Sequence, residues 1–566
     1  MAGSQPIVGA AIQVYAAGTT GNGSGSTALL TTAINTDATG AFTVPAGYAC
    51  PATSSQLYVV VRGGQVGNSS DNAAITLASA LGACNQIVAA SKFVVNEVTT
   101  AAAAWGLAQF LNTGGNVGAT ATNAQGLANA FATVTNLADP TDGTSPGAAF
   151  PKTGVSPAAK INTLANVLNN CTTAASACSQ LFSAATPSGG SAPANTLDAA
   201  LNVARNPGNS VAAIYAQQTS GPFTPALTAA PSDWTLFINY SGGGVNVPSG
   251  LGIDSTGSIW VTSYAGVASK FSTTGNPVFA NGITGSGLLS TYSLAVDGQD
   301  NVWIPNQQSS SVNGGLGSVT VLNSSGQPIS GATGYSSGGI YFPEAIAIDT
   351  NGTVWIVNNG NSTLTLLSST GQPLSGAKGY TSTQFGFPIA VAIDTNHNGW
   401  VANSDEDTVT KVSADGTQIT SYACCDAPAG IAIDQRGDVW VANYYGDSIS
   451  QLASDGTVIS SGYSDMKASI NHPQGMAIDG SGHVWVANYR GPSITELAGS
   501  AASSPGQILS PTAGYAADAK LLEAYAIQVD ASGNIWITNQ GTSILTEIVG
   551  LATPVKTPSI GTPQAP

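Results

Sequence analysis

The chain is 566 residues long, which is enough for about three or four domains of ordinary size. Only 7% of its residues are charged, and 13 Lys and Arg against 29 Asp and Glu leave a net charge of −16. This shortage of cations excludes nucleic acid as a partner, because a run of phosphates could not be neutralised. No apolar stretch reaches the roughly 18 residues of a transmembrane segment.

The composition also bears on the compartment. Ser, Thr, Asn and Gly are abundant whereas Lys and Met are scarce, as is typical of exported proteins. The first basic residue is Arg62, so the N-terminus lacks the charged segment of a signal peptide. We therefore expect a mature extracellular or cell-surface protein of a bacterium, from which a signal peptide has been removed.

Six cysteines fall in three local couples, each within one expected domain. This spacing favours local disulfides over six buried thiols of a cytosolic protein. For the adjacent couple, two free thiols or an intermolecular bridge are equally compatible with the sequence, and a bridge would make a rigid knob on a loop. The expected pairs are Cys50 with Cys84, Cys171 with Cys178, and Cys424 with Cys425.

Residues 1–92 consist of short β-branched and aromatic runs separated by turn-forming residues, which predicts a small β-sandwich. The strand "GAAIQVY" and the later "TDATGAF" resemble the pattern of prealbumin-like, carboxypeptidase-regulatory-like domains of bacterial surface proteins. The residues that carry the resemblance are Gly9 to Tyr15, Thr36, Asp37, Gly40 and Phe42.

Residues 93–231 change to Ala-rich segments with apolar residues at helical spacing, and Asn or Ser stands where helices would begin. Four short helices are expected to form a compact α-helical domain packed on a neighbour.

Residues 232–566 contain one motif repeated seven times, an Asp followed six residues later by a Trp. Four short antiparallel strands fit between successive repeats, and radial packing buries both faces of such sheets. We therefore predict a seven-bladed β-propeller, with each Trp filling the space between blades. The Asp residues are Asp254, Asp297, Asp349, Asp394, Asp434, Asp479 and Asp530, and the Trp residues are Trp260, Trp303, Trp355, Trp400, Trp440, Trp485 and Trp536.

The last repeat stops after its third strand, and the stretch 233–243 is a strand without a blade of its own. We expect this stretch to complete the seventh blade and so to lock the ring. The blade pattern x-I-x-x-D-x-x-G-x-x-W resembles that of the NHL-repeat propellers and of the streptogramin (virginiamycin B) lyases. The expected fold is thus mainly β and multidomain: sandwich, helical domain and propeller, in that order.

The resemblance to the lyases implies a His pair with Glu and magnesium, and often a Glu at the end of the second strand of a blade. Here His397 and His483 lie in turns at one end of the blades, and His472 lies in a loop at the opposite end, so the three histidines cannot converge on one metal. His472 is the candidate catalytic base, and a solvent-facing loop residue is the alternative. The position of the Glu holds Ser263, Asn306, Asn358, Asn403, Asn443, Asn488 or Asn539.

The segment 394–405 matches part of a calcium-loop pattern, with Asp394, Asn396 and Asn398 as candidate ligands. The alternative is a plain hairpin turn, since every blade has an Asp at this place. Ca²⁺ and Mg²⁺ are the cofactors that these two patterns would imply.

Loops between second and third strands should share one face of a propeller with loops that enter the next blade. On this face we expect a binding site for a protein or glycan, and solvated loop residues are the alternative. The function that we expect is therefore binding by an exported protein, with self-assembly through loose terminal strands as one form of it; a streptogramin-lyase-like lyase or hydrolase is the alternative. The candidate ligand-binding residues are Asp405, Glu406, Asp407, Tyr444, Tyr445, Asp447, Tyr489 and Arg490.

Overall fold

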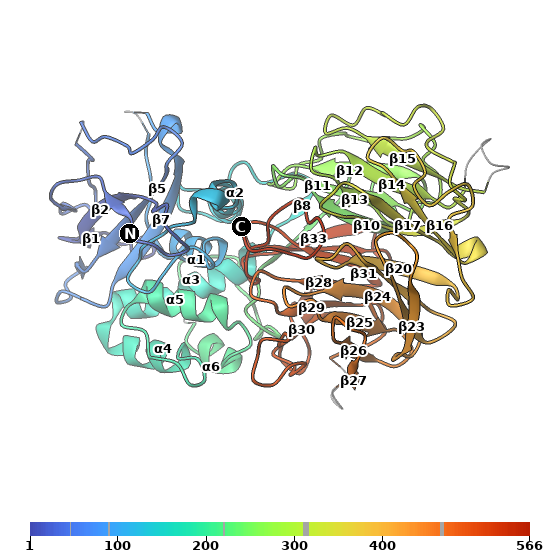
Figure 1. Cartoon of the computed structure of the whole chain (residues 1–566). Helices are drawn as coiled ribbons and strands as arrows, with labels where there is room; N and C mark the ends of the chain where they lie inside the picture. Colours follow the sequence, from blue (N-terminus) through green and yellow to red (C-terminus); the bar gives the residue numbers. More distant parts are fainter. Residues whose placement is uncertain (46, 89–90, 219–220, 309–315, 465–468) are drawn as a thin grey trace.

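The computed structural model describes residues 1–566 except 46, 89–90, 219–220, 309–315 and 465–468. A sheet and a group of helices from the N-terminal part lie beside a larger assembly of β-sheets, which the C-terminal part forms (Figure 1). In the described residues, no helix has the length and apolar character that crossing a membrane requires.

The N-terminal part is built on one sheet that is covered on both faces. Its strands run in the order β3-β2-β5-β7, with β4 also paired to β2, and β1 pairs separately with β6. Val59 and Val61 of β5 pack into a core with β1 and β6, whereas Tyr58 and Val60 pack into the core that holds the helices. The strands are β1 (Ile7–Val8), β2 (Ala11–Ala16), β3 (Thr27–Ala28), β4 (Ile34–Asn35), β5 (Gln56–Arg62), β6 (Gln65–Val66) and β7 (Thr76–Ala83).

This arrangement differs from a separate sandwich, because helices form the layer on one face of the sheet. The buried side chains of β5 alternate between two cores because a strand has a period of two, and that pattern is the same whichever element covers the second face. The sandwich and the prealbumin-like family therefore stay predictions for residues 1–92.

The helices surround α1, which is buried along its whole length. Asn96 caps its first turn by accepting from the Thr99 backbone N–H at 3.0 Å, as Asn does at helix starts. Glu97 in the first turn accepts from Thr172 Oγ1 at 2.6 Å and from an amide of α3, so the buried carboxylate has partners. The helices are α1 (Glu97–Gly106), α2 (Ala124–Leu137), α3 (Ala158–Thr173), α4 (Cys178–Ala184), α5 (Thr196–Arg205) and α6 (Val211–Tyr215).

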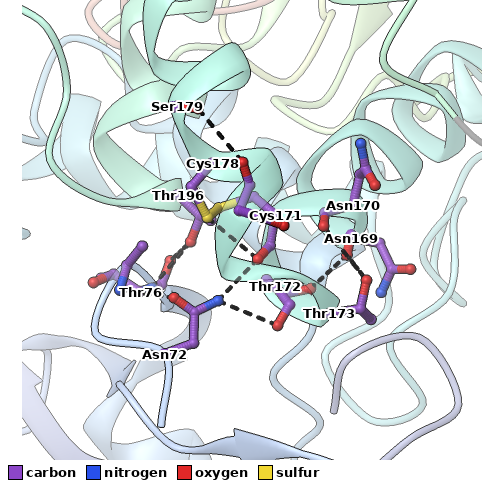
Figure 2. The surroundings of a disulfide bond; sticks show 12 residues. Asn72, Thr76, Asn169, Asn170, Cys171, Thr172, Thr173, Cys178, Ser179 and Thr196 are labelled. Carbon is purple, nitrogen blue, oxygen red and sulfur yellow. Dashed lines mark hydrogen bonds between the residues drawn. A yellow bond between two sulfur atoms is a disulfide. The ribbon is translucent and has the colours of Figure 1, made fainter. Parts of the chain in front are cut away.

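A disulfide between Cys171 and Cys178 joins the end of α3 to the start of α4 (Figure 2). Asn72, from the loop before β7, donates from Nδ2 to the Cys171 carbonyl at 2.9 Å, so this turn is tied to the N-terminal sheet. The structure also contains the disulfides Cys50–Cys84 and Cys424–Cys425, so all three local couples are bonded in it.

Residues 248–548 form successive antiparallel sheets whose first strands follow one another around a ring. The first strands are in contact in the order β10, β13, β16, β20, β24, β28, β31, and β31 contacts β10 again. This closed arrangement is that of a β-propeller. The strands are β10 (Pro248–Ile253), β11 (Ile259–Ser263), β12 (Val267–Phe271), β13 (Ala295–Val296), β14 (Val302–Asn306), β15 (Ser318–Leu322), β16 (Pro343–Ile348), β17 (Val354–Asn358), β18 (Thr363–Leu367), β19 (Tyr380–Thr381), β20 (Pro388–Ile393), β21 (Gly399–Asn403), β22 (Thr408–Val412), β23 (Ile419–Ala423), β24 (Pro428–Ile433), β25 (Val439–Asn443), β26 (Ser448–Leu452), β27 (Val458–Tyr463), β28 (Pro473–Ile478), β29 (Val484–Asn488), β30 (Ile494–Leu497), β31 (Ala524–Val529), β32 (Ile535–Asn539) and β33 (Ile544–Ile548).

The last sheet is completed by a strand from before the first one. β9 (Phe237–Tyr240) pairs with β33, as expected from the unpaired stretch 233–243, and β8 (Gly154–Val155) extends the same sheet by pairing with β9. The last sheet therefore contains residues from three distant parts of the chain, and the helical part is tied to the ring by backbone pairing.

Residues at both ends of the sequence contact the rest of the fold, and pairing of terminal strands with neighbouring molecules stays a prediction. The Met1 amino group donates to the Val95 carbonyl at 2.8 Å. Ala552 and Val555 are buried after the last strand, and the Gly561 backbone N–H donates to the Ile348 carbonyl at 3.2 Å.

One hydrophobic core runs through the helices and into the ring, across the expected boundaries near 92 and 231. It contains Trp105 of α1, Trp234 and Trp536 of β32. The Trp105 indole N–H donates to the Trp234 carbonyl at 3.0 Å. The helical part and the first and last sheets thus share buried contacts, and the domain limits of the sequence prediction remain a proposal.

The repeated Asp and Trp are joined to each other. In every repeat the Asp Oδ1 accepts from the backbone N–H groups two and four residues later, which closes the turn between the first two strands. In six repeats the Asp Oδ2 also accepts from the Trp indole N–H, at 2.9 to 3.2 Å. Each Trp is buried between sheets and has its polar atom satisfied by the turn of its own sheet, except Trp355, whose Nε1 has no hydrogen-bond partner.

Candidate binding face

The end of the ring opposite these turns is built by a second repeated residue, an Asn at the end of the second strand. Asn443 accepts from the Asp426 backbone N–H at 3.3 Å and donates from Nδ2 to Ser448 Oγ and Ser450 Oγ at 3.0 and 2.8 Å. The buried amide therefore joins the entering loop to the third strand. The equivalent residues Asn306, Asn358, Asn403 and Asn488 also accept from the residue 17 positions earlier.

An amide suits this role, because it accepts from the entering loop and donates to the hydroxyl groups of the third strand, whereas a carboxylate only accepts. The Asn at the end of the second strand therefore has a structural role in these repeats.

Two loop carboxylates of the predicted site form hydrogen bonds with the loop that leads into the first strand of the next sheet, which we call the entry loop. Asp407 Oδ1 accepts from the Ala427 backbone N–H at 2.7 Å, and Asp447 Oδ1 accepts from the His472 backbone N–H at 2.6 Å. Asp407 and Asp447 occupy matching positions in successive sheets, each with positive φ. Their carboxylates position loops, a role that the sequence analysis did not assign to them.

His472 lies between a carboxylate and two aromatic rings. Its Nδ1 is 3.3 Å from Asp447 Oδ1 and 3.0 Å from Asn471 Oδ1. The ring centroid lies 4.8 Å from that of Tyr444 with the rings nearly perpendicular, and 6.3 Å from that of Tyr445. The histidine is therefore held in place by polar and aromatic contacts at the rim of this face.

Four tyrosines continue this aromatic group across the face. The ring centroid of Tyr444 lies 5.2 Å from that of Tyr445 and 5.9 Å from that of Tyr489, and Tyr489 lies 6.5 Å from Tyr525. Tyr445 is 71% exposed and can contact a ligand without any change in the fold. We call Tyr444, Tyr445, Tyr489, Tyr525 and His472 the aromatic rim.

The other predicted residues lie around this rim. Asp405 and Glu406 are exposed in the turn between β21 and β22, and the Arg490 side chain is exposed beside Tyr489. Cys424 is buried against Trp400, so the adjacent disulfide is not a protruding knob on this face.

The sequence analysis missed a carboxyl group near the axis of the ring. Glu344 stands at the start of β16 and forms a hydrogen bond with Gln307 Nε2. Burial raises the pKa of Glu344 to about 7, and the hydrogen bond from Gln307 opposes this effect. Burial also raises the pKa of Tyr292 to about 12 and that of Tyr525 well above its usual value, with the Glu344 carboxylate as a further cause in both cases.

Two cavities accompany the ring. One, of about 210 Å³, is lined by the later residues of the first strands, such as Ile346 and Ile348, and by Val555 of the C-terminal segment. The other, of about 560 Å³, lies at the turn end between Asp349 and the segment 556–564.

The predicted metal ligands serve the turn in which they lie. Asp394 Oδ1 accepts from the backbone N–H groups of Asn396 and Asn398 at 2.9 Å each, and Oδ2 accepts from the Trp400 indole at 3.1 Å. These are the bonds that the other repeats form without a calcium-loop pattern. Across the described part of the chain, no group of three or more His, Cys, Asp and Glu side chains is arranged to hold a metal ion. The calcium site at Asp394, Asn396 and Asn398 stays a prediction.

No family model matches the chain, and no curated protein matches it. Among solved structures, a streptogramin B lyase is 15% identical with a TM-score of 0.42, over 55% of this chain and 97% of that protein. A catalytically inactive virginiamycin B lyase from Staphylococcus aureus with quinupristin is 14% identical with a TM-score of 0.43, over 55% and 98% of the two chains. A gluconolactonase from Xanthomonas campestris is 16% identical with a TM-score of 0.33, over 56% and 90%.

Proposed function

We propose that this protein is an exported or cell-surface binding protein whose ring is a seven-bladed propeller of the NHL type, and that its ligand binds at the aromatic rim. The observation that carries the proposal is the rim itself, where connected aromatic rings lie partly exposed on one face of the ring. Aromatic side chains offer a large contact area at little entropic cost, as binding surfaces commonly do.

The disulfides support the location outside the cytoplasm, because such bonds persist in oxidising compartments. Self-assembly into an envelope layer or fibre remains part of the proposal. Size-exclusion chromatography with light scattering tests it, since an assembling chain elutes far above its 56.2 kDa mass.

A glycan or a protein surface suits the rim, since tyrosine rings stack on sugar rings or apolar side chains and their hydroxyls form hydrogen bonds. The test is binding of the whole chain to a glycan array and to purified envelope proteins. A Tyr445→Ala, Tyr489→Ala double variant should lose at least tenfold in affinity for any ligand found. Tyr48→Ala, in the N-terminal part, is the matched control and should bind like the parent chain. Equal binding by the two variants would contradict the proposal.

A lyase or hydrolase activity is the second candidate, favoured by the 3.3 Å approach of His472 Nδ1 to Asp447 Oδ1. A carboxylate at this position could orient a histidine that acts as a general base. Mass spectrometry of a streptogramin B incubated with the protein tests this activity. Turnover that disappears in His472→Asn would support the candidate, and unchanged substrate with the parent chain would exclude this reaction.

A further inference from the structure

Each entry loop ends with a residue whose backbone has a positive φ. In this conformation the side chain of any residue other than Gly is crowded by its own backbone, and bulky or β-branched residues rarely adopt it. Gly and Asn would take it at the lowest cost, yet neither stands at any of these seven positions. We call these residues the entry residues: Val247 (φ 52°), Ser290 (51°), Phe342 (46°), Phe387 (51°), Ala427 (49°), His472 (46°) and Glu523 (54°).

The fold accounts for the backbone of the entry residues. The carbonyl of each one accepts from the backbone N–H of the residue 17 positions later, in the loop after the second strand, at 3.0 to 3.2 Å. The backbone N–H groups of Ala427 and His472 also donate to loop carboxylates of the preceding sheet. These bonds require no particular side chain, and the side chains differ in size, polarity and charge from repeat to repeat. A constant backbone thus carries a variable set of side chains.

Large apolar side chains lie exposed at and beside the entry residues. Phe387 is 45% exposed and Val247 is 38% exposed. Where the entry residue is Ser or Glu, in the second and seventh repeats, a leucine stands directly before it. These leucines are Leu289 and Leu522, which are 36% and 52% exposed. Folding gains little from apolar side chains that stay in water, whereas unfavourable backbone conformations that the surroundings maintain are typical of binding sites.

These side chains lie on opposite sides of the loop end. The first strands follow one another in a closed order, in which two strands separate β20 from β31 on one way around and three on the other. Phe387 directly precedes β20, and Leu522 lies in the loop that enters β31. A ligand that covers both side chains must extend across the whole end of the ring. A folded protein does so, whereas a short glycan does not.

We propose that the loop end of the ring binds a folded protein, and that the side chains at and beside the entry residues determine which protein binds. This inference rests on the proposed function and selects a protein surface over a glycan as the ligand. The contact patch of the partner is apolar, to cover Phe387 and Val247, and basic residues border it, since Asp405, Glu406 and Asp426 are exposed at the same end. The net charge of −16 favours the approach of such a partner.

A first test needs no partner. Phe387→Gly relieves the crowding at positive φ and removes an exposed side chain, so the midpoint of urea unfolding should be no lower than that of the parent. Phe385, in the same loop, is 5% exposed and packs in the core between the third and fourth sheets, so Phe385→Ala should lower the midpoint clearly. If Phe387→Gly lowers it as strongly as Phe385→Ala, Phe387 serves the fold and the proposal is overturned.

The binding test uses surface plasmon resonance with the whole chain immobilised and purified basic and acidic envelope proteins as probes. For a protein that binds the parent chain, Phe387→Ser and Leu522→Ser should each raise the Kd about tenfold or more, although the two residues lie on opposite sides of the ring. Leu374→Ser is the matched control, because Leu374 is 54% exposed but follows β18 at the turn end, and it should leave the Kd unchanged. Thermal unfolding checks that each variant is folded.

The outcomes separate this inference from the proposed function. A glycan or protein that depends on Tyr445 and Tyr489, but binds Phe387→Ser and Leu522→Ser as it binds the parent, would overturn the inference and leave the proposed function standing. A protein that depends on Phe387 and Leu522 but not on the two tyrosines would support the inference and contradict binding at the aromatic rim. If none of the proteins and glycans tested binds the parent chain, both are wrong.

Discussion

The two ends of the ring use their repeated residues differently. At the turn end, the Asp of each repeat closes its turn and in six cases also accepts from the indole N–H of its Trp. The hydrogen bonds of these carboxylates therefore stabilise the fold. At the loop end, the Asn of five repeats accepts in the same way from the entering loop, but the surrounding side chains differ from sheet to sheet. Glu344 is among these, and it has no charged partner within the described residues.

This contrast teaches where to look for function in a repeat protein. A residue that recurs in every repeat with all its hydrogen bonds made inside the repeat is explained by folding. Folding does not explain a residue that occurs once, lies where several repeats converge and lacks a partner for its charge. Such a residue is a candidate for function.

The largest effect should come from removing the Asp at the turn end. Asp434→Ala leaves two backbone N–H groups and the Trp440 indole without an acceptor, and each buried unpaired group costs about 1–3 kcal/mol. We expect the free energy of unfolding to fall by roughly 3–5 kcal/mol, measured as a lower midpoint of urea unfolding.

The third repeat offers the matched control, because its Asp does not form a hydrogen bond with the indole N–H of its Trp. Asp349 accepts from the backbone of its turn, and its Oδ2 lies 3.4 Å from His397 Nδ1. Asp349→Ala should therefore destabilise the chain by about 1–2 kcal/mol less than Asp434→Ala. Equal losses would show that the indole hydrogen bond contributes nothing.

A stability effect of the opposite sign is expected at Glu344. Its pKa is raised to about 7 from an ordinary value of 4.5, so between these pH values the folded chain binds more protons than the unfolded chain. The contribution of Glu344 to stability therefore falls as pH rises through this window, by about 3 kcal/mol at full ionisation.

Glu344→Gln tests this sign, because it removes the charge and keeps the size of the side chain. The variant should match the parent in urea unfolding near pH 4.5 and exceed it in stability at pH 8. Burial also raises the pKa of Glu547, to about 8, but that group is present in both chains and cancels in the difference. A variant that is less stable than the parent at pH 8 would contradict the assignment of an unpaired carboxylate.

Substitution of Asn443, at the loop end of the ring, should reduce the free energy of unfolding by an intermediate amount. Asn443→Ala removes one acceptor and one donor group that join the entry loop to β26, and we expect a loss of about 2 kcal/mol in the free energy of unfolding. Asn443→Asp keeps the acceptor but cannot donate to the two serines, so it should not restore the stability of the parent. Rescue by Asp would show that the donated bonds are unimportant.

Much of the ring was predictable, because its evidence is local and repeated. The constant six-residue spacing of Asp and Trp indicates one hairpin per repeat, and the unpaired stretch near Phe237 predicted the strand that closes the last sheet. The same constancy could have indicated the hydrogen bond between Asp434 and Trp440. The Ser or Thr five or seven residues after the Asn could likewise have indicated that the Asn amide joins the second strand to the third.

The partner of Glu344 was not predictable from the sequence for a geometric reason. Glu344 and Gln307 belong to neighbouring sheets, and the packing of these sheets brings the two side chains together without a motif or a short spacing. Glu344 also lies where the pairing of β16 and β17 shifts register, so alternation along the strand does not tell which way it points. The sequence predicted helices but did not show that they cover one face of the N-terminal sheet, since a strand pattern records burial and not the covering element.

The smallest effect on stability, joined to a large one on binding, should come from Tyr445. Its side chain is 71% exposed and its ring contacts those of Tyr444 and His472, so Tyr445→Ala should change the free energy of unfolding by no more than about 0.5 kcal/mol. Tyr240→Ala is the comparison, because it removes a buried tyrosine instead of an exposed one. That tyrosine is fully buried, donates to Glu547 Oε2 at 2.7 Å and stacks on Trp536, so its loss should cost several kcal/mol. If Tyr445→Ala destabilised the chain as Tyr240→Ala does, the rim would be part of the fold, and the difference between the two ends of the ring would disappear.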